Sequence, residues 1–290
     1  MTTESGLVVV DKPGGLTSHD VVARVRRLAG TRKVGHAGTL DPMATGVLVL
    51  GVNRATRLLG HLTLADKRYD ATIRLGVTTT TDDAEGEVVE TRSTDALTET
   101  AVRTALSGFV GEIDQVPSAV SAIKVDGKRA YARVRAGEEV DLPARRVTIH
   151  SLDVVATSLD RHGGAVDVEV SVHCSSGTYV RSIARDLGVS LGVGGHLTAL
   201  RRTTVGPFGL TDARTLDALA EHFTMTPIAD AARAAFPARA LDDAQAADVR
   251  VGRRLNLDLG ATTALFAPDG EFLALYEPGD GSARAVAVFV

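Results

Sequence analysis

The chain has a single cysteine, no tryptophan and few aromatic residues, which make up 4% of its 290 positions. One cysteine excludes an internal disulfide and any zinc or iron–sulfur cluster built on several thiolates. The eight histidines show neither HxxxH nor HExxH spacing, so we expect no catalytic metal. A P-loop and a GxSxG nucleophile motif are also missing, and nothing therefore indicates nucleotide hydrolysis or serine-hydrolase chemistry.

Long hydrophobic runs are missing as well. Runs such as Val47–Leu50 fall far short of the ~18 residues that a membrane span needs. The opening MTTESGLVVV lacks the positive start of a signal peptide. A composition of 44% hydrophobic and 23% charged residues is that of an ordinary globular protein. We expect a cytoplasmic protein without a membrane partner, with one large domain or a large and a small one.

The net charge of −4 is unevenly distributed along the chain. Residues 1–70 carry ten Lys or Arg against six acids, and residues 120–150 carry seven against four. Residues 78–100 hold seven acids and one arginine. Local basic surface attracts phosphates whatever the average charge, so an RNA partner is compatible with this pattern. A solvated charged surface is the alternative.

Periodicity predicts strands at Gly6–Asp11, Val47–Val52, Lys67–Leu75 and Ala165–Cys174. A helix capped by Ser18 is expected through Leu28, with Gly30 just after it. The acidic stretch with Asp82 and Asp83 is interpreted as a solvated turn. Further helices are expected at 97–109, from Tyr179 through Leu187, and at 216–223 and 229–235. Because strands and helices mix without a regular βα repeat, the pattern favours an α+β fold.

Two further segments differ in character. Residues 124–146 are basic and polar, with one aromatic residue, Tyr131, and predict a projecting, mobile element. A composition change near residue 237 predicts a domain boundary. The tail beyond it carries β-like stretches at 264–267, 272–276 and 285–290.

Three residues are candidates for chemistry. Asp41 lies in a glycine-rich loop before Pro42, which restricts its backbone; it is either a turn residue or a presented carboxylate. Arg181 follows a turn at a strand-to-helix junction, and is either a surface residue or the partner of a buried carboxylate. Tyr69 lies on the apolar face of its strand, where it either packs in the core or stacks on a base. Cys174 is interpreted as a core thiol.

Six ordered sequence blocks carry a resemblance. They are GLVVVDKPGGLTSHDVVARVRR, GHAGTLDPMATGVLVLGVNRATRL, KRYDATIRLG, VPSAVSAIKVDGKRAYARVRAGEEV, HCSSGTYVRSIARDLG and HLTALRRTTVGPF. Together they resemble the bacterial tRNA pseudouridine-55 synthases, the TruB family, over roughly residues 6–212. The HAGTLDP block differs from the HRLD-type block of families that modify ribosomal RNA.

The resemblance implies a pseudouridine-synthase fold: a mixed, mostly antiparallel central sheet flanked by helices in residues 1–236, and a short PUA-like β domain in 237–290. It implies isomerisation of uridine 55 in the T-loop of tRNA by base flipping, glycosidic cleavage and reattachment through C5. Asp41 would be the catalytic aspartate. The substrate-binding residues would be Tyr69, Arg181, Leu200 and His36.

The resemblance also assigns supporting roles. Residues 124–146 would form a thumb that closes on the RNA through Lys124, Lys128 and Arg129. Lys12 and Pro13 would support the active-site loop. Val120 departs from the family, in which many members have an aromatic residue there. The implied enzyme needs no cofactor and no metal. Its partner is the tRNA T-stem-loop, without guide RNA or an obligatory protein partner.

Two alternatives use the same residues. The chain could be a non-catalytic tRNA-binding or folding factor. A glycoside hydrolase would need a second carboxylate near Asp41, and no motif supplies one.

Overall fold

The computed structural model describes residues 4–118, 124–125, 128–129, 142–158 and 164–290. For residues 124–125, 128–129 and 157–158 only the backbone is described. The chain divides into two compact units. The first unit holds residues 1–42, 46–63 and 204–290, and the second holds 43–45 and 64–203. Strand β12 (Gly195–Val205) carries the chain from the second unit back into the first.

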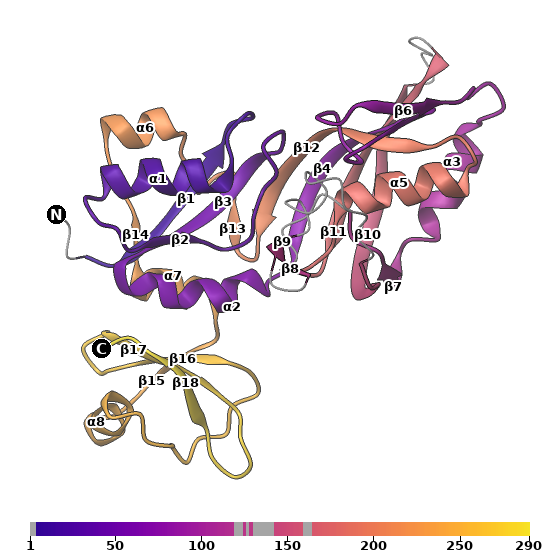
Figure 1. The fold of residues 1–290 in the computed structure, drawn as a ribbon. Coiled ribbons are helices and arrows are strands. Elements are labelled where there is room, and N and C mark those ends of the chain that lie inside the picture. The colour runs from indigo at the N-terminus through magenta and orange to yellow at the C-terminus, as the bar shows by residue number, and fades with distance from the viewer. Residues whose placement is uncertain (1–3, 119–123, 126–127, 130–141, 159–163) are drawn as a thin grey trace. The chain divides into compact units, whose positions relative to one another are not determined.

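The first unit is built around strand β3 (Thr45–Val52), which pairs antiparallel with β1 (Gly6–Lys12) and with β2 (Val34–His36). The remaining elements before the C-terminal segment are α1 (Ser18–Leu28), η1 (Asn53–Leu58), α2 (Leu59–Thr63), β13 (Phe208–Gly209), α6 (Leu216–Glu221), β14 (Thr226–Pro227) and α7 (Ile228–Ala235). Helix α1 packs on α6 and β2, while α7 packs on β1 (Figure 1). The consecutive apolar residues of β1 and β3 are buried on both faces of these strands.

The C-terminal segment forms its own four-stranded sheet. It comprises β15 (Ala238–Ala240), α8 (Asp243–Arg250), β16 (Thr263–Phe266), β17 (Phe272–Glu277) and β18 (Arg284–Val288), in the order β15-β16-β17-β18. Phe266, Phe272 and Phe289 join the same hydrophobic core as Val9 and Val47. The three predicted β stretches are confirmed, and the division of the chain at residue 237 stays a prediction.

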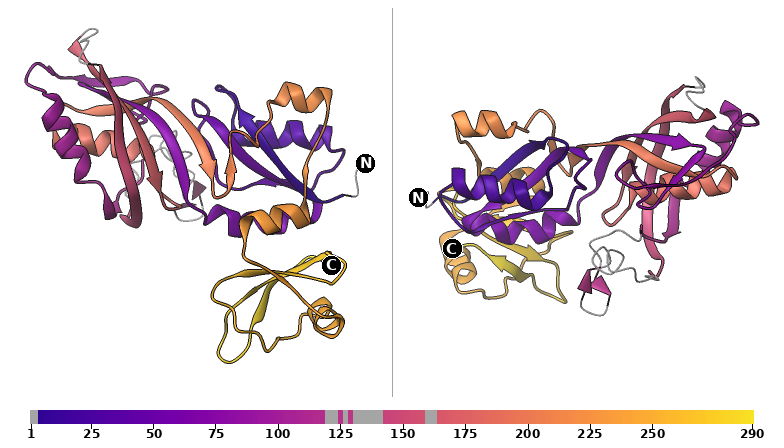
Figure 2. Two further views of the ribbon diagram at one scale, coloured as in Figure 1. Left: turned by 180° about the vertical axis from the view of Figure 1, so that it is seen from behind. Right: turned by 45° about the horizontal axis from the view of Figure 1, so that its top comes forward.

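The second unit is a sheet in the order β12-β4-β11-β10-β7. Its strands besides β12 are β4 (Lys67–Leu75), β11 (Val166–Cys174), β10 (Arg145–Ser158) and β7 (Gly111–Gln115), and β4, β11, β10 and β7 pair antiparallel with their neighbours in that order. Helices α3 (Glu99–Ser107) and α5 (Val180–Ser190) contact each other and lie on one face of this sheet, as the view from behind shows (Figure 2). The opposite face carries the alternate, more exposed side chains, so we call it the open face. Two small hairpins add β5 (Val77–Thr79) with β6 (Val88–Thr91) and β8 (Lys124–Val125) with β9 (Lys128–Arg129).

Most expected elements are present, with instructive corrections. Helix α1 is capped by Thr17, which forms a capping box with Asp20, and not by Ser18. The Ser18 hydroxyl is buried and instead exchanges hydrogen bonds with the backbone of Leu40. Arg145 and Arg146, the last residues of the predicted projecting segment, open β10 and pair with β7. No helix in the described part of the chain is long and apolar enough to cross a membrane.

Candidate active site and basic pocket

Asp41 lies in the first unit, half-buried in the irregular loop between β2 and β3. Its two neighbours in the chain are tied down. Leu40 donates its N–H to the Ser18 hydroxyl at 2.9 Å and accepts from that hydroxyl at 3.1 Å. The Pro42 carbonyl accepts from the backbone N–H of Gly15 at 2.8 Å. The backbone that presents the Asp41 carboxylate is therefore fixed on both sides.

Lys12 adds a charged contact to the same loop. Its side chain is fully buried at the end of β1, and its ammonium donates to the carbonyls of Leu16 (2.7 Å), Pro13 (2.9 Å) and Pro42 (3.2 Å). A buried ammonium has three donors, and three carbonyl acceptors satisfy that geometry. We call this arrangement the Lys12 clasp. It joins the turn after β1 to the residue that follows Asp41.

His36 ends strand β2, five residues before Asp41, and is half-buried. Its ring meets that of His19, from α1, edge to face at 5.7 Å between centroids. The two rings thus lie on the first unit together with Asp41, Lys12 and Pro13. Tyr69, Leu200 and Arg181 lie in the second unit.

Tyr69 is buried on β4, directly opposite Val172 of β11. The burial of Tyr69, Ala71, Ile73 and Leu75 confirms the predicted alternation of this strand. Leu200 is buried on β12 and borders a cavity of about 550 Å³ in the second unit. That cavity also has polar walls, from residues such as Asp70, Thr72, Glu169 and Arg201.

Arg181 is almost completely buried in the first turn of α5. Its Nη1 donates to the Thr81 carbonyl at 3.0 Å and to the Ser118 hydroxyl at 3.4 Å, and lies 3.3 Å from Oδ2 of Asp83. The side-chain amide of Gln115 fixes Tyr179, the residue just before α5. It accepts a hydrogen bond from the Tyr179 N–H and donates one to the Tyr179 carbonyl. The interpretation of Arg181 as a surface residue is therefore wrong, and a buried carboxylate does contact it.

That carboxylate, Asp83, is the residue that sequence reasoning missed. The solvated turn predicted around it is wrong at this position, because Asp83 is 2% exposed. It also accepts hydrogen bonds from the Thr81 hydroxyl and the Glu85 N–H. In the neighbouring residue Asp82, Oδ2 lies 3.5 Å from Nη1 of Arg185. Burial raises the pKa of the Asp82 carboxyl above its ordinary value. The available signal was the run of four threonines at 78–81 followed by Asp82 and Asp83, since Thr and Asp side chains favour hydrogen-bonded turns.

Two more cations of the second unit are buried. Lys67 begins β4 and donates to the Ala65 carbonyl at 2.7 Å, and burial lowers the pKa of its ammonium to about 8. Arg202 is 1% exposed on β12. Cys174 is fully buried opposite Lys67, and burial raises the pKa of its thiol to about 11, which makes it a weak nucleophile. The interpretation of Cys174 as a core thiol is confirmed.

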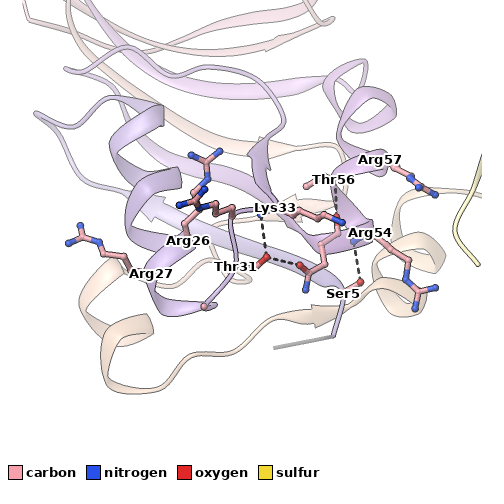
Figure 3. Close-up of a pocket in the computed structure, with 11 residues that line it drawn as sticks. Ser5, Arg26, Arg27, Thr31, Lys33, Arg54, Thr56 and Arg57 are labelled. Atoms are coloured by element: carbon pink, nitrogen blue, oxygen red, sulfur yellow. Dashed lines mark hydrogen bonds between the residues drawn. The ribbon is translucent and has the colours of Figure 1, made fainter. Parts of the chain in front are cut away.

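A basic pocket of about 1090 Å³ opens in the first unit (Figure 3). None of the described residues that line it is acidic. Its cationic residues come from α1, the turn after it and η1: Arg26, Arg27, Arg32, Lys33, Arg54 and Arg57. Arg54 and Arg57 are anchored by hydrogen bonds to the carbonyls of Phe289 (2.7 Å) and Val288 (2.6 Å). This pocket gathers the excess positive charge that the sequence shows before residue 70.

The side chains of the predicted thumb residues lie outside the residues that the structure describes. The backbones of Lys124, Lys128 and Arg129 belong to the β8–β9 hairpin, while their side chains, and Val120 and Tyr131 as a whole, are not among the described residues. At the end of the segment, Arg146 forms ion pairs with Glu112 at 3.0 Å and Asp114 at 3.3 Å. Its pKa is raised by these partners. The roles of the thumb residues stay predictions.

The chain matches known families along nearly its whole length. Residues 26–180 match the TruB family pseudouridylate synthase N-terminal domain, 181–242 match a tRNA pseudouridylate synthase B C-terminal domain, and 236–290 match a tRNA pseudouridine synthase II C-terminal domain. Proteins called tRNA pseudouridine synthase B from Arthrobacter sp. (strain FB24) and Thermobifida fusca (strain YX) are 59% and 60% identical. Each match covers 98% of this chain, and 96% and 98% of the respective relative.

Solved structures show the same fold. A chain of a Cbf5-Nop10-Gar1 complex gives a TM-score of 0.74 at 26% identity, covering 98% of this chain and 85% of that chain. A chain of an H/ACA RNP bound to a substrate RNA containing 2′-deoxyuridine gives 0.73 at 24% identity, with the same coverage. The predicted α+β fold, with its central sheet and C-terminal β domain, and the predicted enzyme class are confirmed. The chain belongs to the TruB family of pseudouridylate synthases.

Proposed function

We propose that this protein converts uridine 55 in the T-loop of tRNA to pseudouridine, with Asp41 as its catalytic residue. The observation that carries the proposal is the HAGTLDP block on a loop whose flanking residues are fixed by Ser18 and the Lys12 clasp. The name shared by relatives of 57–60% identity supports tRNA as the substrate.

The reaction is an isomerisation that balances without a co-reactant. The C1′–N1 glycosidic bond breaks, the uracil rotates, and a C1′–C5 bond forms. The proton on C5 is lost and a proton is gained at N1. The Asp41 carboxylate acts at the ribose, as an anion facing the sugar from which the base departs. No oxidation or group transfer is involved, so the chemistry needs no redox cofactor.

The remaining residues bind and orient the nucleotide. Tyr69 stacks on the flipped base, Leu200 contacts its apolar face, and Arg181 keeps the carboxylate of Asp41 ionised. A carboxylate in a closed pocket needs such a cation, because it would otherwise take up a proton. His36 fills the space that the uridine leaves in the loop. Flipping costs about a few kcal/mol of unstacking, which contacts to the RNA offset.

Contacts to the RNA backbone are supported by the basic pocket. Six cations without a lining acid form a surface suited to phosphates, and the basic segment 124–146 adds seven more Lys or Arg. We propose that the T-stem-loop is recognised by this protein alone, without guide RNA or an obligatory partner protein. Its place of action is the cytoplasm, where tRNA is found.

The test uses an unmodified tRNA transcript and its isolated T-arm hairpin. After incubation, pseudouridine is mapped at nucleotide resolution, and we expect modification at position 55 of both RNAs. Asp41→Asn should abolish conversion, at least 10³-fold, while RNA affinity stays within threefold, because only one charge is removed. Asp258→Asn, an exposed loop aspartate of the first unit, is the matched control and should keep full activity.

Two outcomes would count against the proposal. Normal turnover by Asp41→Asn would show that this carboxylate is not catalytic. Tight tRNA binding by the wild-type protein without any pseudouridine would favour the alternative, a tRNA-binding or folding factor.

A further inference from the structure

Three side chains with metal-binding chemistry meet on the open face of the second unit, from segments far apart in the sequence. Asp66 lies directly before β4, His150 is on β10, and His173 is on β11. Their ligand atoms all lie within 4.8 Å of one another. Sequence spacing could not reveal this group, because the sheet and not a helix brings the two histidines together.

A β-bulge places His150 in this group. The register pairs Ile149 with Cys174 and Ser151 with His173, which leaves His150 as an extra residue on β10. Ile149 can therefore occupy the buried position opposite Cys174 while His150 turns to the open face beside His173. The two rings lie 4.6 Å apart between centroids. Bulges commonly re-aim a side chain at a functional position in this way.

The distances suit coordination better than hydrogen bonding. Both histidines direct Nε2 at the same carboxylate oxygen, Oδ2 of Asp66, at 3.3 Å for His150 and 3.7 Å for His173. An N–H···O hydrogen bond is typically about 2.9–3.0 Å long. Ligand atoms on a tetrahedral Zn²⁺ with bonds of about 2.0–2.1 Å are separated by about 3.3–3.4 Å. The 3.3 Å separation of His150 Nε2 from Asp66 Oδ2 matches that edge length, and the 3.7 Å separation of His173 Nε2 is slightly longer.

We propose that Asp66, His150 and His173 form a binding site for a divalent transition-metal ion of the Zn²⁺ type. Two imidazole nitrogens and one carboxylate oxygen are ligands that Zn²⁺ and Co²⁺ accept, whereas Mg²⁺ and Ca²⁺ prefer oxygen alone. Three protein ligands leave a fourth position for water. The Cys174 thiol takes no part, because it is buried on the other face of β11.

Arg68 limits the affinity of this site. It is paired with His173 across β4 and β11, so its positive charge lies on the same face as the proposed site. Like charges repel, so removing this guanidinium should tighten metal binding. If Asp66, His150 and His173 bound no metal ion, removing the Arg68 guanidinium would leave the metal affinity of the protein unchanged.

The test is calorimetric titration of ZnCl₂ into the full-length protein after treatment with a chelator. We expect about one equivalent of Zn²⁺, with at least tenfold weaker binding by His150→Ala and by His173→Ala. The matched control is His222→Ala, an exposed histidine after α6, which should bind as the wild type does. Arg68→Gln should bind roughly fivefold more tightly.

Spectra of the Co²⁺-loaded protein provide a second readout. We expect ligand-field bands that are lost in His173→Ala, and no thiolate charge-transfer band in the wild type. Thermal unfolding with and without Zn²⁺ verifies that each variant is folded, and only proteins that bind the ion should gain stability from it. Binding lost equally in His222→Ala, or binding no tighter than millimolar in the wild type, would overturn the proposal. Pseudouridine formation is not the readout, so failure here is distinguishable from failure of the proposed function.

Discussion

Arg181 and Asp83 face each other across 3.3 Å between Nη1 and Oδ2, and neither side chain is more than 5% exposed. A buried ion pair of this kind depends on both partners, because either charge alone is strongly disfavoured away from water. The arrangement places a fixed positive charge at the start of α5. Asp83 therefore supports the position of the arginine that we propose acts on Asp41.

Replacing Asp83 by Asn should lower the free energy of unfolding by about 3 kcal/mol, because the guanidinium of Arg181 loses a buried anionic partner. Urea denaturation measures this change. The matched control is Asp167→Asn, which breaks the more exposed ion pair with Arg74 and should cost at most about 1 kcal/mol. Equal losses of unfolding free energy in the two variants would contradict the argument that burial makes the Arg181–Asp83 pair more important for stability.

Lys12→Met removes the Lys12 clasp while keeping the volume of the side chain. Three part-buried hydrogen bonds from a charged donor are lost, so we expect a loss of about 1–3 kcal/mol in stability. The single-turnover rate of pseudouridine formation should fall at least tenfold, with tRNA affinity within threefold. Lys33→Met, at an exposed position, should change stability by less than about 0.5 kcal/mol. An unchanged rate in Lys12→Met would show that the loop keeps its conformation without the clasp.

Lys67 should make stability depend on pH in the alkaline range. Its pKa is about 8 in the folded protein against an ordinary 10.5, so between these values the unfolded chain binds more protons. The free energy of unfolding should therefore increase by roughly 2 kcal/mol as pH rises from 8 to 10.5, because the Lys67 ammonium loses its proton in the folded protein first. Lys67→Met should lack this contribution and be more stable than the wild type at pH 7. The measurement is urea denaturation across this range, and parallel curves for the two proteins would refute the prediction.

The basic pocket should be visible in the salt dependence of tRNA binding. Replacing Arg27 and Lys33 together by Gln should reduce the slope of log K against log salt by roughly 1 for each phosphate that the variant no longer neutralises. Arg103→Gln, in the second unit and paired with Glu99, is the control and should leave the slope unchanged. A slope that does not move in the double variant would place the RNA away from this pocket.

The parts of the fold that follow from periodicity were predictable. The alternation from Tyr69 to Leu75 and the apolar stripe of α1 are visible in the sequence and present in the structure. Strand β12, which carries Leu200, was not predicted, because its second half is Arg201-Arg202-Thr203-Thr204. A buried arginine such as Arg202 breaks the rule that strands bury apolar residues, so local pattern cannot reveal it.

The roles proposed for the candidate site residues come from the resemblance alone and stay predictions. Residue chemistry alone left Asp41 as a turn residue or a carboxylate, and it left Arg181 as a surface residue or a partner. The resemblance supplied roles but not the neighbours that hold these residues. Ser18, Asp83 and Gln115 act through contacts with residues at least 20 positions away, which no local pattern encodes.

The Lys12 clasp has a consequence for how the enzyme uses binding free energy. Lys12 and Ser18 fix the loop around Asp41 during folding. The conformational entropy of this loop is therefore already lost before RNA binds. If Asp41 acts as we propose, interactions with the tRNA can then contribute to opening its loop rather than to ordering the catalytic loop. Preorganisation of this kind would lower the activation barrier of the chemical step without requiring tighter binding of the substrate.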